Sequence, residues 1–291
     1  MSTLVYFEDL FGEINIPSLG ITRILFGIIC LCKIYLLLKN RYEYFGVKGF
    51  YPYKTWEINC KKNEHFSVFH YLKPNNFSVD FVLFFGAISS FFLTIGFCTE
   101  VSCFITFCLI TSLNNRNQFI FNGGDSLLRI MLFLLIFSNC GFYISVDNAI
   151  YNRKQLEICI NPWIVRLMQI VVIKVYFGAF YAKLLCSDLW LKGTGLYYSM
   201  NTKIANRYDL NKYLNRPAFI FLNYAILAAE SVLVLGLIFK ETSTICVFIL
   251  IFMHLLFEIF LRINLFGIIM VACLFLFLRS DVINIFIKLL N

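Results

Sequence analysis

The chain has few charged residues for its length. Of 291 residues only 14% are Asp, Glu, Lys or Arg, whereas 60% are hydrophobic, and the mean hydropathy is +0.77. Soluble domains carry about 25% charged residues, so this composition excludes an ordinary soluble protein. The formal net charge of +8 does not indicate nucleic-acid binding, because the Lys and Arg residues lie mainly between apolar runs, as membrane topology requires.

Several signatures of soluble enzymes and metal proteins are also absent. The sequence has no Walker loop, no dinucleotide-binding glycine turn and no serine triad. Only three histidines are present: His65 and His70 fall in a loop, so His254 and Glu258, one helical turn apart, lack the further ligands that a metal site needs. We therefore expect no metal.

Eleven cysteines are present, but none form a CxxC pair. Seven lie inside apolar runs, where a free cysteine commonly packs as a small hydrophobic residue. The other four lie in loops or near the ends of apolar runs, and a disulfide between some of them stays open: Cys60, Cys98, Cys159 and Cys186.

The apolar runs are long enough to cross a membrane. A bilayer core of about 30 Å requires about 20 apolar residues per helix, and such windows fall near 18–38, 78–98, 125–145, 161–185, 216–239 and 243–262. Two shorter runs, 100–114 and 264–279, raise the expected number to about eight. Only helices satisfy the backbone internally in so apolar a chain, so we predict an all-α, polytopic integral membrane helix bundle forming a single domain over 1–291.

The first of these helices is expected to be retained in the mature protein. Residues 1–17 contain three acidic residues and no Lys or Arg ahead of the first apolar run, unlike a cleavable signal peptide.

Lys183 lies deep in the apolar window 161–185. An ammonium group at membrane depth is costly, so an ionisable residue there indicates a functional site. Removal from water favours the neutral amine, which can act as a base. The alternative is that Lys183 extends from the helix end to the membrane interface, because the apolar run stops soon afterwards at Cys186.

Helical periodicity separates the two lysines of this window. At about 100° per residue, Gln169, Tyr176 and Ala179 share one face with Lys183, whereas Lys174 lies on the opposite side. Lys183 is therefore the better candidate for a site within the bundle.

A second candidate constellation lies at the start of the window 125–145. Asp125 follows two glycines and is suited to the first turn of a helix, where carboxylates are favoured. Arg129 is four residues further on, the spacing of an ion pair along a helix. Either the glycines let backbone amides approach a ligand here, or the group is a helix cap with a local salt bridge.

Glu230 lies in the middle of the window 216–239. A buried carboxylate needs a partner, and four cations are candidates: Arg23, Arg129, Lys174 and Lys183. His254 is interpreted either as a proton shuttle or as a hydrogen-bonded contact between helices.

With these residues located, the chain resembles the horizontally transferred transmembrane (HTTM) family over roughly residues 18–280. This family includes the membrane part of vitamin K-dependent γ-glutamyl carboxylase. The matching pieces occur in the same order along the chain: Thr22–Gly27, Gly96–Cys103, Asn115–Asn117, Asn122–Asp125, Ser145–Asp147, Tyr176–Lys183, Trp190 and Gly193.

The resemblance implies a chemistry for Lys183. In the carboxylase, the lysine after a Tyr-Phe-x-Ala pattern deprotonates vitamin K hydroquinone, and the oxygenated quinone then abstracts a γ-proton from Glu. By this resemblance Lys183 is the base and a reduced quinone is the cosubstrate. Asp125 and Glu230 are predicted as further catalytic residues because they would set the charge around Lys183. Three residues are assigned to cofactor binding: Arg129, Tyr176 and Trp190.

Two departures from the carboxylase favour the small bacterial members of the family. The carboxylase has an intramembrane histidine where this chain reads Gly123-Gly-Asp125, and it continues into a large extracytoplasmic domain, whereas this sequence ends at Asn291. The chain is thus expected to lack the substrate-docking part. The sporulation-delaying protein B family is one such bacterial branch, and its members work with a partner protein to mature a secreted antimicrobial peptide.

The sequence therefore favours a carboxylase-like enzyme of the bacterial cell membrane. Its expected partners are the lipid bilayer, a secreted peptide and a soluble partner protein, with no nucleic acid. The competing class is a non-enzymatic export, chaperone or immunity protein of an antimicrobial-peptide system. A transporter is the third class, although the sequence shows no inverted repeat.

Overall fold

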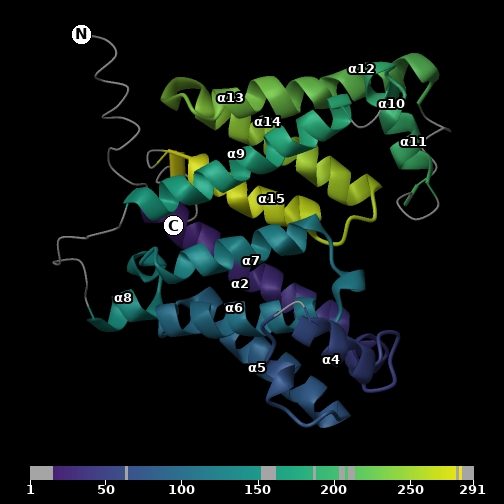
Figure 1. The fold of residues 1–291 in the computed structure, drawn as a ribbon. Coiled ribbons are helices and arrows are strands. Elements are labelled where there is room, and N and C mark those ends of the chain that lie inside the picture. Colours follow the sequence, from purple (N-terminus) through teal and green to yellow (C-terminus); the bar gives the residue numbers. More distant parts are fainter. Residues whose placement is uncertain are drawn as a thin grey trace. The chain divides into compact units, whose positions relative to one another are not determined.

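The computed structural model describes residues 16–62, 65–151, 162–185, 188–202, 207–208, 214–279 and 282–283. These residues are mostly helical, which confirms the predicted all-α fold (Figure 1). The chain divides into two compact units, the first ending at Val165 and the second beginning at Arg166.

Four helices make up most of the first unit: α2 (Ile16–Leu38), α5 (Asn76–Ile95), α6 (Thr99–Arg116) and α7 (Gly123–Ile136). Each helix packs against the next, and α7 also contacts α2, so the four close into a bundle around buried aliphatic side chains (Figure 1). The ends are set by local signals. Asn75 caps α5 by accepting a hydrogen bond from the Ser78 amide, and Gly96 ends α5 in the left-handed region, with φ of 71°.

The connection between α2 and α5 carries three short helices: α3 (Arg41–Phe45), α4 (Tyr53–Lys62) and η1 (Val68–His70). Buried Arg116, at the end of α6, holds this connection by donating to the carbonyl oxygens of Gly46 at 2.9 Å and Tyr51 at 2.8 Å. Burial lowers the pKa of Arg116 to about 10, so the guanidinium remains charged at neutral pH.

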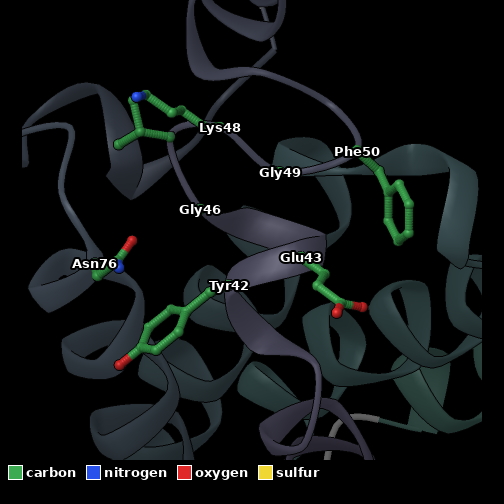
Figure 2. A pocket seen from close by; sticks show the side chains of 8 residues that line it. Tyr42, Glu43, Gly46, Lys48, Gly49, Phe50 and Asn76 are labelled. Atoms are coloured by element: carbon green, nitrogen blue, oxygen red, sulfur yellow. The ribbon is translucent and has the colours of Figure 1, made fainter.

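A surface cavity of about 630 Å³ opens in this connection. Figure 2 shows Tyr42 and Glu43 on α3, with Lys48 in the loop that follows and Asn76 at the start of α5. The lining of this cavity combines a carboxylate, an amine, an amide and aromatic rings. None of the predicted site residues is among its lining residues.

The second unit contains most of α9 (Pro162–Leu185) and all later helices. The short α10 (Asp188–Leu191) and α11 (Gly195–Asn201) follow α9. Then come α12 (Arg216–Ala228), the π-helical turn η6 (Ala229–Leu233) and α13 (Val234–Gly236), which form one continuous rod (Figure 1). The last described helices are α14 (Lys240–Phe260), α15 (Phe266–Leu274) and the 3₁₀ turn η7 (Phe275–Phe277).

Five helices are long and apolar enough to cross a membrane: 17–38, 76–95, 163–185, 216–236 and 241–260. The other three predicted windows are also helical, but they do not confirm the expected number of eight. The largest difference is at 125–145, where α7 stops at Ile136 and Asn139 turns the chain with φ of 52°. An apolar window shows where a chain can enter lipid, but it does not show that a helix ends or that a left-handed residue follows inside the window.

Candidate functional site

Buried Glu230 forms an ion pair with partly buried Lys183 in the second unit. Lys183 lies near the end of α9, and Glu230 lies in η6. Lys183 Nζ contacts Glu230 Oε1, and the two side chains are 19% and 7% exposed. Four cations were candidate partners of Glu230 from the sequence, and Lys183 is the one that pairs with it in the structure.

The turn that carries Glu230 is unusual. A π-helical turn contains an extra residue and is seen mostly as a short insertion in α-helices, often at functional sites. Here it interrupts an otherwise apolar rod at the one acidic residue in that rod.

Only one of the two carboxylate oxygens of Glu230 has a partner among the described residues. Oε1 is paired with Lys183, whereas Oε2 has no hydrogen-bond partner among the residues that the structure describes. Because a buried carboxylate oxygen without a donor costs free energy, Oε2 is a position where a proton or a donor group is stabilised. The pair thus combines a cation, an anion and a vacant proton-accepting atom.

Trp190 covers the amino group of Lys183. The Nζ atom lies 5.1 Å from the indole centroid, within the range of a cation–π contact. Buried Asn223 of α12 fixes the Trp190 segment: its amide nitrogen donates to the Trp190 carbonyl oxygen at 2.9 Å, and its amide oxygen accepts from the Leu196 amide at 3.1 Å. Gly195 leaves room for the ring, since a Cβ there would lie 2.5 Å from Trp190 Cδ2.

An apolar cavity of about 740 Å³ also lies in the second unit, and neither Lys183, Glu230 nor Trp190 is among the residues that line it. Its lining includes Leu196 and Ile226, members of the buried cluster against which Trp190 packs. Ala229, the residue before Glu230, also lines it, as does Phe257 of α14. The cavity therefore reaches the residue before Glu230 and the cluster that holds Trp190, and it is suited to an apolar ligand.

Tyr176 lies two helical turns before Lys183 on the same face of α9. Its hydroxyl is 2.7 Å from His254 Nε2 on α14, and both side chains are buried. The interpretation of His254 as a hydrogen-bonded contact between helices is supported by this geometry. The other three predicted residues of the second unit cluster together: Lys183, Glu230 and Trp190.

Asp125 and Arg129 belong to the first unit, and they do not pair with each other. Asp125 Oδ2 accepts from the Asn122 amide at 2.8 Å and completes a capping box at the start of α7. Its Oδ1 contacts Lys33 of α2, while Arg129 donates to Asn115 Oδ1 at 3.3 Å. A catalytic role for Asp125 and a cofactor-binding role for Arg129 remain predictions.

Two polar residues in this account were not singled out from the sequence. Lys33 lies in the first apolar window and Asn223 in the fifth. A polar residue at membrane depth requires a partner, and both residues carry this signal in the sequence, as Lys183 does.

The remaining sequence predictions concern metals and disulfides. Among the described residues no group of three or more His, Cys, Asp or Glu side chains is close enough to hold a metal ion. Cys60 and Cys98 are free thiols, while Cys159 and Cys186 lie outside the described residues.

Comparison with known families matches residues 11–282 to the HTTM domain. The chain belongs to the HTTM family. The match runs through both units, and with five candidate spans it establishes a multi-pass integral membrane protein. Comparisons with curated proteins and with solved structures found no match.

Three of the HTTM pieces noted in the sequence meet in the first unit. Asp147 accepts hydrogen bonds from the amides of Cys98 and Thr99, each at 2.8 Å, and so caps α6 from a distance of about fifty residues in sequence. Buried Arg23 donates to the Cys140 and Ile144 carbonyl oxygens. These pieces have a structural explanation, because each satisfies backbone groups at the ends of helices.

Proposed function

We propose that this HTTM protein is an integral membrane enzyme, similar to vitamin K-dependent carboxylase, that modifies a secreted peptide with Lys183 as the base. The observation that carries the proposal is the pairing of buried Glu230 with partly buried Lys183, in the unit that also holds an apolar cavity. A pair of this kind is costly to maintain in an apolar environment. Its retention next to a ligand-sized space supports a chemical role.

The pair can take up one proton without creating an isolated charge. A proton passes from Lys183 Nζ to Glu230, breaking one N–H bond and forming one O–H bond, which leaves a neutral amine. The amine then accepts a proton from an acidic group of the substrate. The pair ends with one proton more than it began with, and Trp190 stabilises the ammonium that forms.

A reduced quinone fits the residues around the pair. The cavity lining is almost entirely apolar, as an isoprenoid or ring system requires, and Trp190 and Phe257 offer aromatic faces near it. A bound reduced quinone would supply, on oxidation by dioxygen, the driving force for removing a weakly acidic proton. The residues that would hold it are those of the cavity lining, Leu196, Ile226, Ala229 and Phe257 among them.

The substrate is proposed to be a secreted peptide, delivered with a soluble partner protein in a bacterial cell membrane. This part rests on the resemblance to the small bacterial members of the family. The chemistry at Lys183 does not depend on it, because a base beside an apolar cavity serves any substrate that reaches the membrane.

The test is the intact mass of secreted peptides from cells that carry the wild-type protein, Lys183→Ala or Lys174→Ala. Lys174 is a matched control because it lies on the same helix but is exposed. We expect a defined modification, such as addition of one carboxyl group, with wild type and Lys174→Ala. With Lys183→Ala we expect its rate to fall about 10²- to 10⁴-fold.

Identical peptide masses in all three strains would contradict the proposal. If secretion of the peptide still required the protein, that result would favour the export or chaperone alternative.

A further inference from the structure

The surface cavity of about 630 Å³ in the first unit lies at the membrane surface. The candidate span 17–38 ends shortly before its first lining residue, Tyr42, and the candidate span 76–95 begins at its last, Asn76. Two consecutive spans are joined at one surface of the membrane, so the connection between α2 and α5 lies there. The cavity in this connection is therefore at the depth of the lipid headgroups.

Positive charge predominates in this connection. Between the two spans the sequence has seven Lys or Arg residues and three Glu. Such an excess of basic residues beside membrane spans is typical of the cytoplasmic side, where anionic lipids give the membrane surface a negative potential. Arg41 and Asp80 add no net charge, because Arg41 Nε lies 2.6 Å from Asp80 Oδ1.

Two polar side chains of the lining are available to a ligand. Lys48 and Asn76 make no hydrogen bond or ion pair with their side chains in the part of the chain that the structure describes. Figure 2 shows both to the left of the loop 46–50, whereas Glu43 and Phe50 lie to its right. An ammonium and an amide are donors, and together they are suited to the oxygens of a phosphate.

Aromatic side chains are exposed around the cavity. Phe50 in the lining is 78% exposed, and Phe77, the residue after Asn76, is 73% exposed. Aromatic rings are favoured at the boundary between water and lipid. A lipid with its phosphate at Lys48 and Asn76 would have these rings beside its glycerol and upper acyl chains.

We propose that this cavity binds the phosphodiester of an anionic phospholipid, with Lys48 and Asn76 donating to the phosphate oxygens. Free phosphate offers the same chemistry, but the position at headgroup depth and the exposed rings of Phe50 and Phe77 favour the lipid. The site belongs to the first unit and does not depend on the chemistry proposed for Lys183.

The test is native mass spectrometry of the full-length protein in detergent, titrated with phosphatidylglycerol, phosphatidylcholine or inorganic phosphate. We expect phosphatidylglycerol to bind most tightly. Phosphatidylcholine has the same phosphodiester but no net charge and should bind more weakly, and inorganic phosphate should give no adduct. Equal affinity for the two lipids, or adducts with inorganic phosphate at the same concentrations, would overturn the assignment to an anionic lipid.

Three charge variants test whether the lipid is in the cavity. Lys48→Gln should weaken the binding of phosphatidylglycerol about 5-fold, whereas Glu43→Gln removes a negative charge from the lining and should strengthen it. Lys54→Gln is the matched control, because Lys54 is an exposed lysine of α4 outside the lining. Solvent ions screen its charge, so the affinity should change less than about 2-fold. Equal weakening by Lys48→Gln and Lys54→Gln would indicate diffuse attraction to the basic connection and contradict a site in the cavity.

Asn76→Ala tests the second donor without a change of charge. We expect phosphatidylglycerol to bind about 3- to 10-fold more weakly, because one hydrogen bond to a charged group is lost. All four substituted side chains are exposed, so the variants should unfold at the wild-type temperature. An unchanged affinity in Asn76→Ala would show that Asn76 does not hold the phosphate.

Discussion

Each unit contains a buried lysine–carboxylate pair, and the two pairs differ in how completely they are satisfied. In the first unit, Asp125 uses one oxygen for Lys33 and the other for the Asn122 amide in a capping box. In the second unit, Glu230 uses one oxygen for Lys183 and leaves the other without a partner among the described residues.

The surroundings of the two pairs also differ: those of Asp125 stabilise a fixed carboxylate, whereas those of Glu230 leave it less well satisfied. Asp125 lies in the first turn of a regular helix, where the helix dipole favours a carboxylate. Glu230 lies in a π-helical turn, with the apolar cavity next to it. The comparison teaches that membrane depth alone does not identify a reactive charge. A vacant polar atom and an adjacent cavity distinguish the Lys183–Glu230 pair from a pair that only holds helices together.

The largest expected effect is on the stability of the first unit. Asp125→Ala leaves Lys33 as an unpaired buried charge, so we expect a loss of about 3–5 kcal/mol in the free energy of unfolding. Denaturant unfolding in nanodiscs measures this. The double variant Lys33→Met/Asp125→Asn removes both charges and should recover most of the loss. If the double variant is as unstable as Asp125→Ala, unpaired charge is not the cause.

A smaller loss is expected when Asn223 is replaced. Asn223→Ala removes the two hydrogen bonds that attach the Trp190 segment to α12. Two buried backbone groups lose their partners, and we expect a cost of about 1–3 kcal/mol together with greater exposure of Trp190. Indole fluorescence in a Trp56→Phe/Trp163→Phe background reports the exposure. An unchanged emission maximum would show that other contacts hold the segment.

The smallest effect concerns the cation–π contact. Trp190→Leu keeps an apolar side chain over Lys183 but removes the aromatic face, so we expect about 0.5–2 kcal/mol less stabilisation of the ammonium. The measurement is the difference in unfolding free energy between Trp190→Leu and wild type, repeated in the Lys183→Met/Glu230→Gln background. A difference of the same size in that background would mean that the contact with Lys183 is not responsible.

The sequence predicted the helices better than the contacts between them. Apolar windows locate helices because the bilayer imposes a length on each span. The windows correctly predicted α2, α5, α9, α12 and α14. The end of α7 was not predicted, because the helix stops at Ile136, and Asn139 turns the chain, inside an apolar run. A hydropathy window does not register such a turn.

Partners of buried charges were harder to predict than their positions. Periodicity placed Tyr176 and Lys183 on one face of α9, but it could not choose among the four possible partners of Glu230, since that choice depends on packing between helices. Likewise, the i to i+4 spacing suggested that Asp125 and Arg129 form a pair, whereas Lys33 of another helix takes that place. Local spacing competes with tertiary contacts, and here the tertiary contact prevails.

The most direct test of the central claim compares Glu230→Gln with Asp125→Asn in the peptide mass assay, with modified peptide expressed per folded protein molecule. The account predicts that Glu230→Gln folds but loses about 10²-fold or more of the modification, because Lys183 can no longer pass its proton to a carboxylate. It predicts that Asp125→Asn reduces the amount of folded protein while each folded molecule stays active. Full activity in Glu230→Gln would contradict the account, and a loss per folded molecule in Asp125→Asn would show instead that Asp125 is itself catalytic.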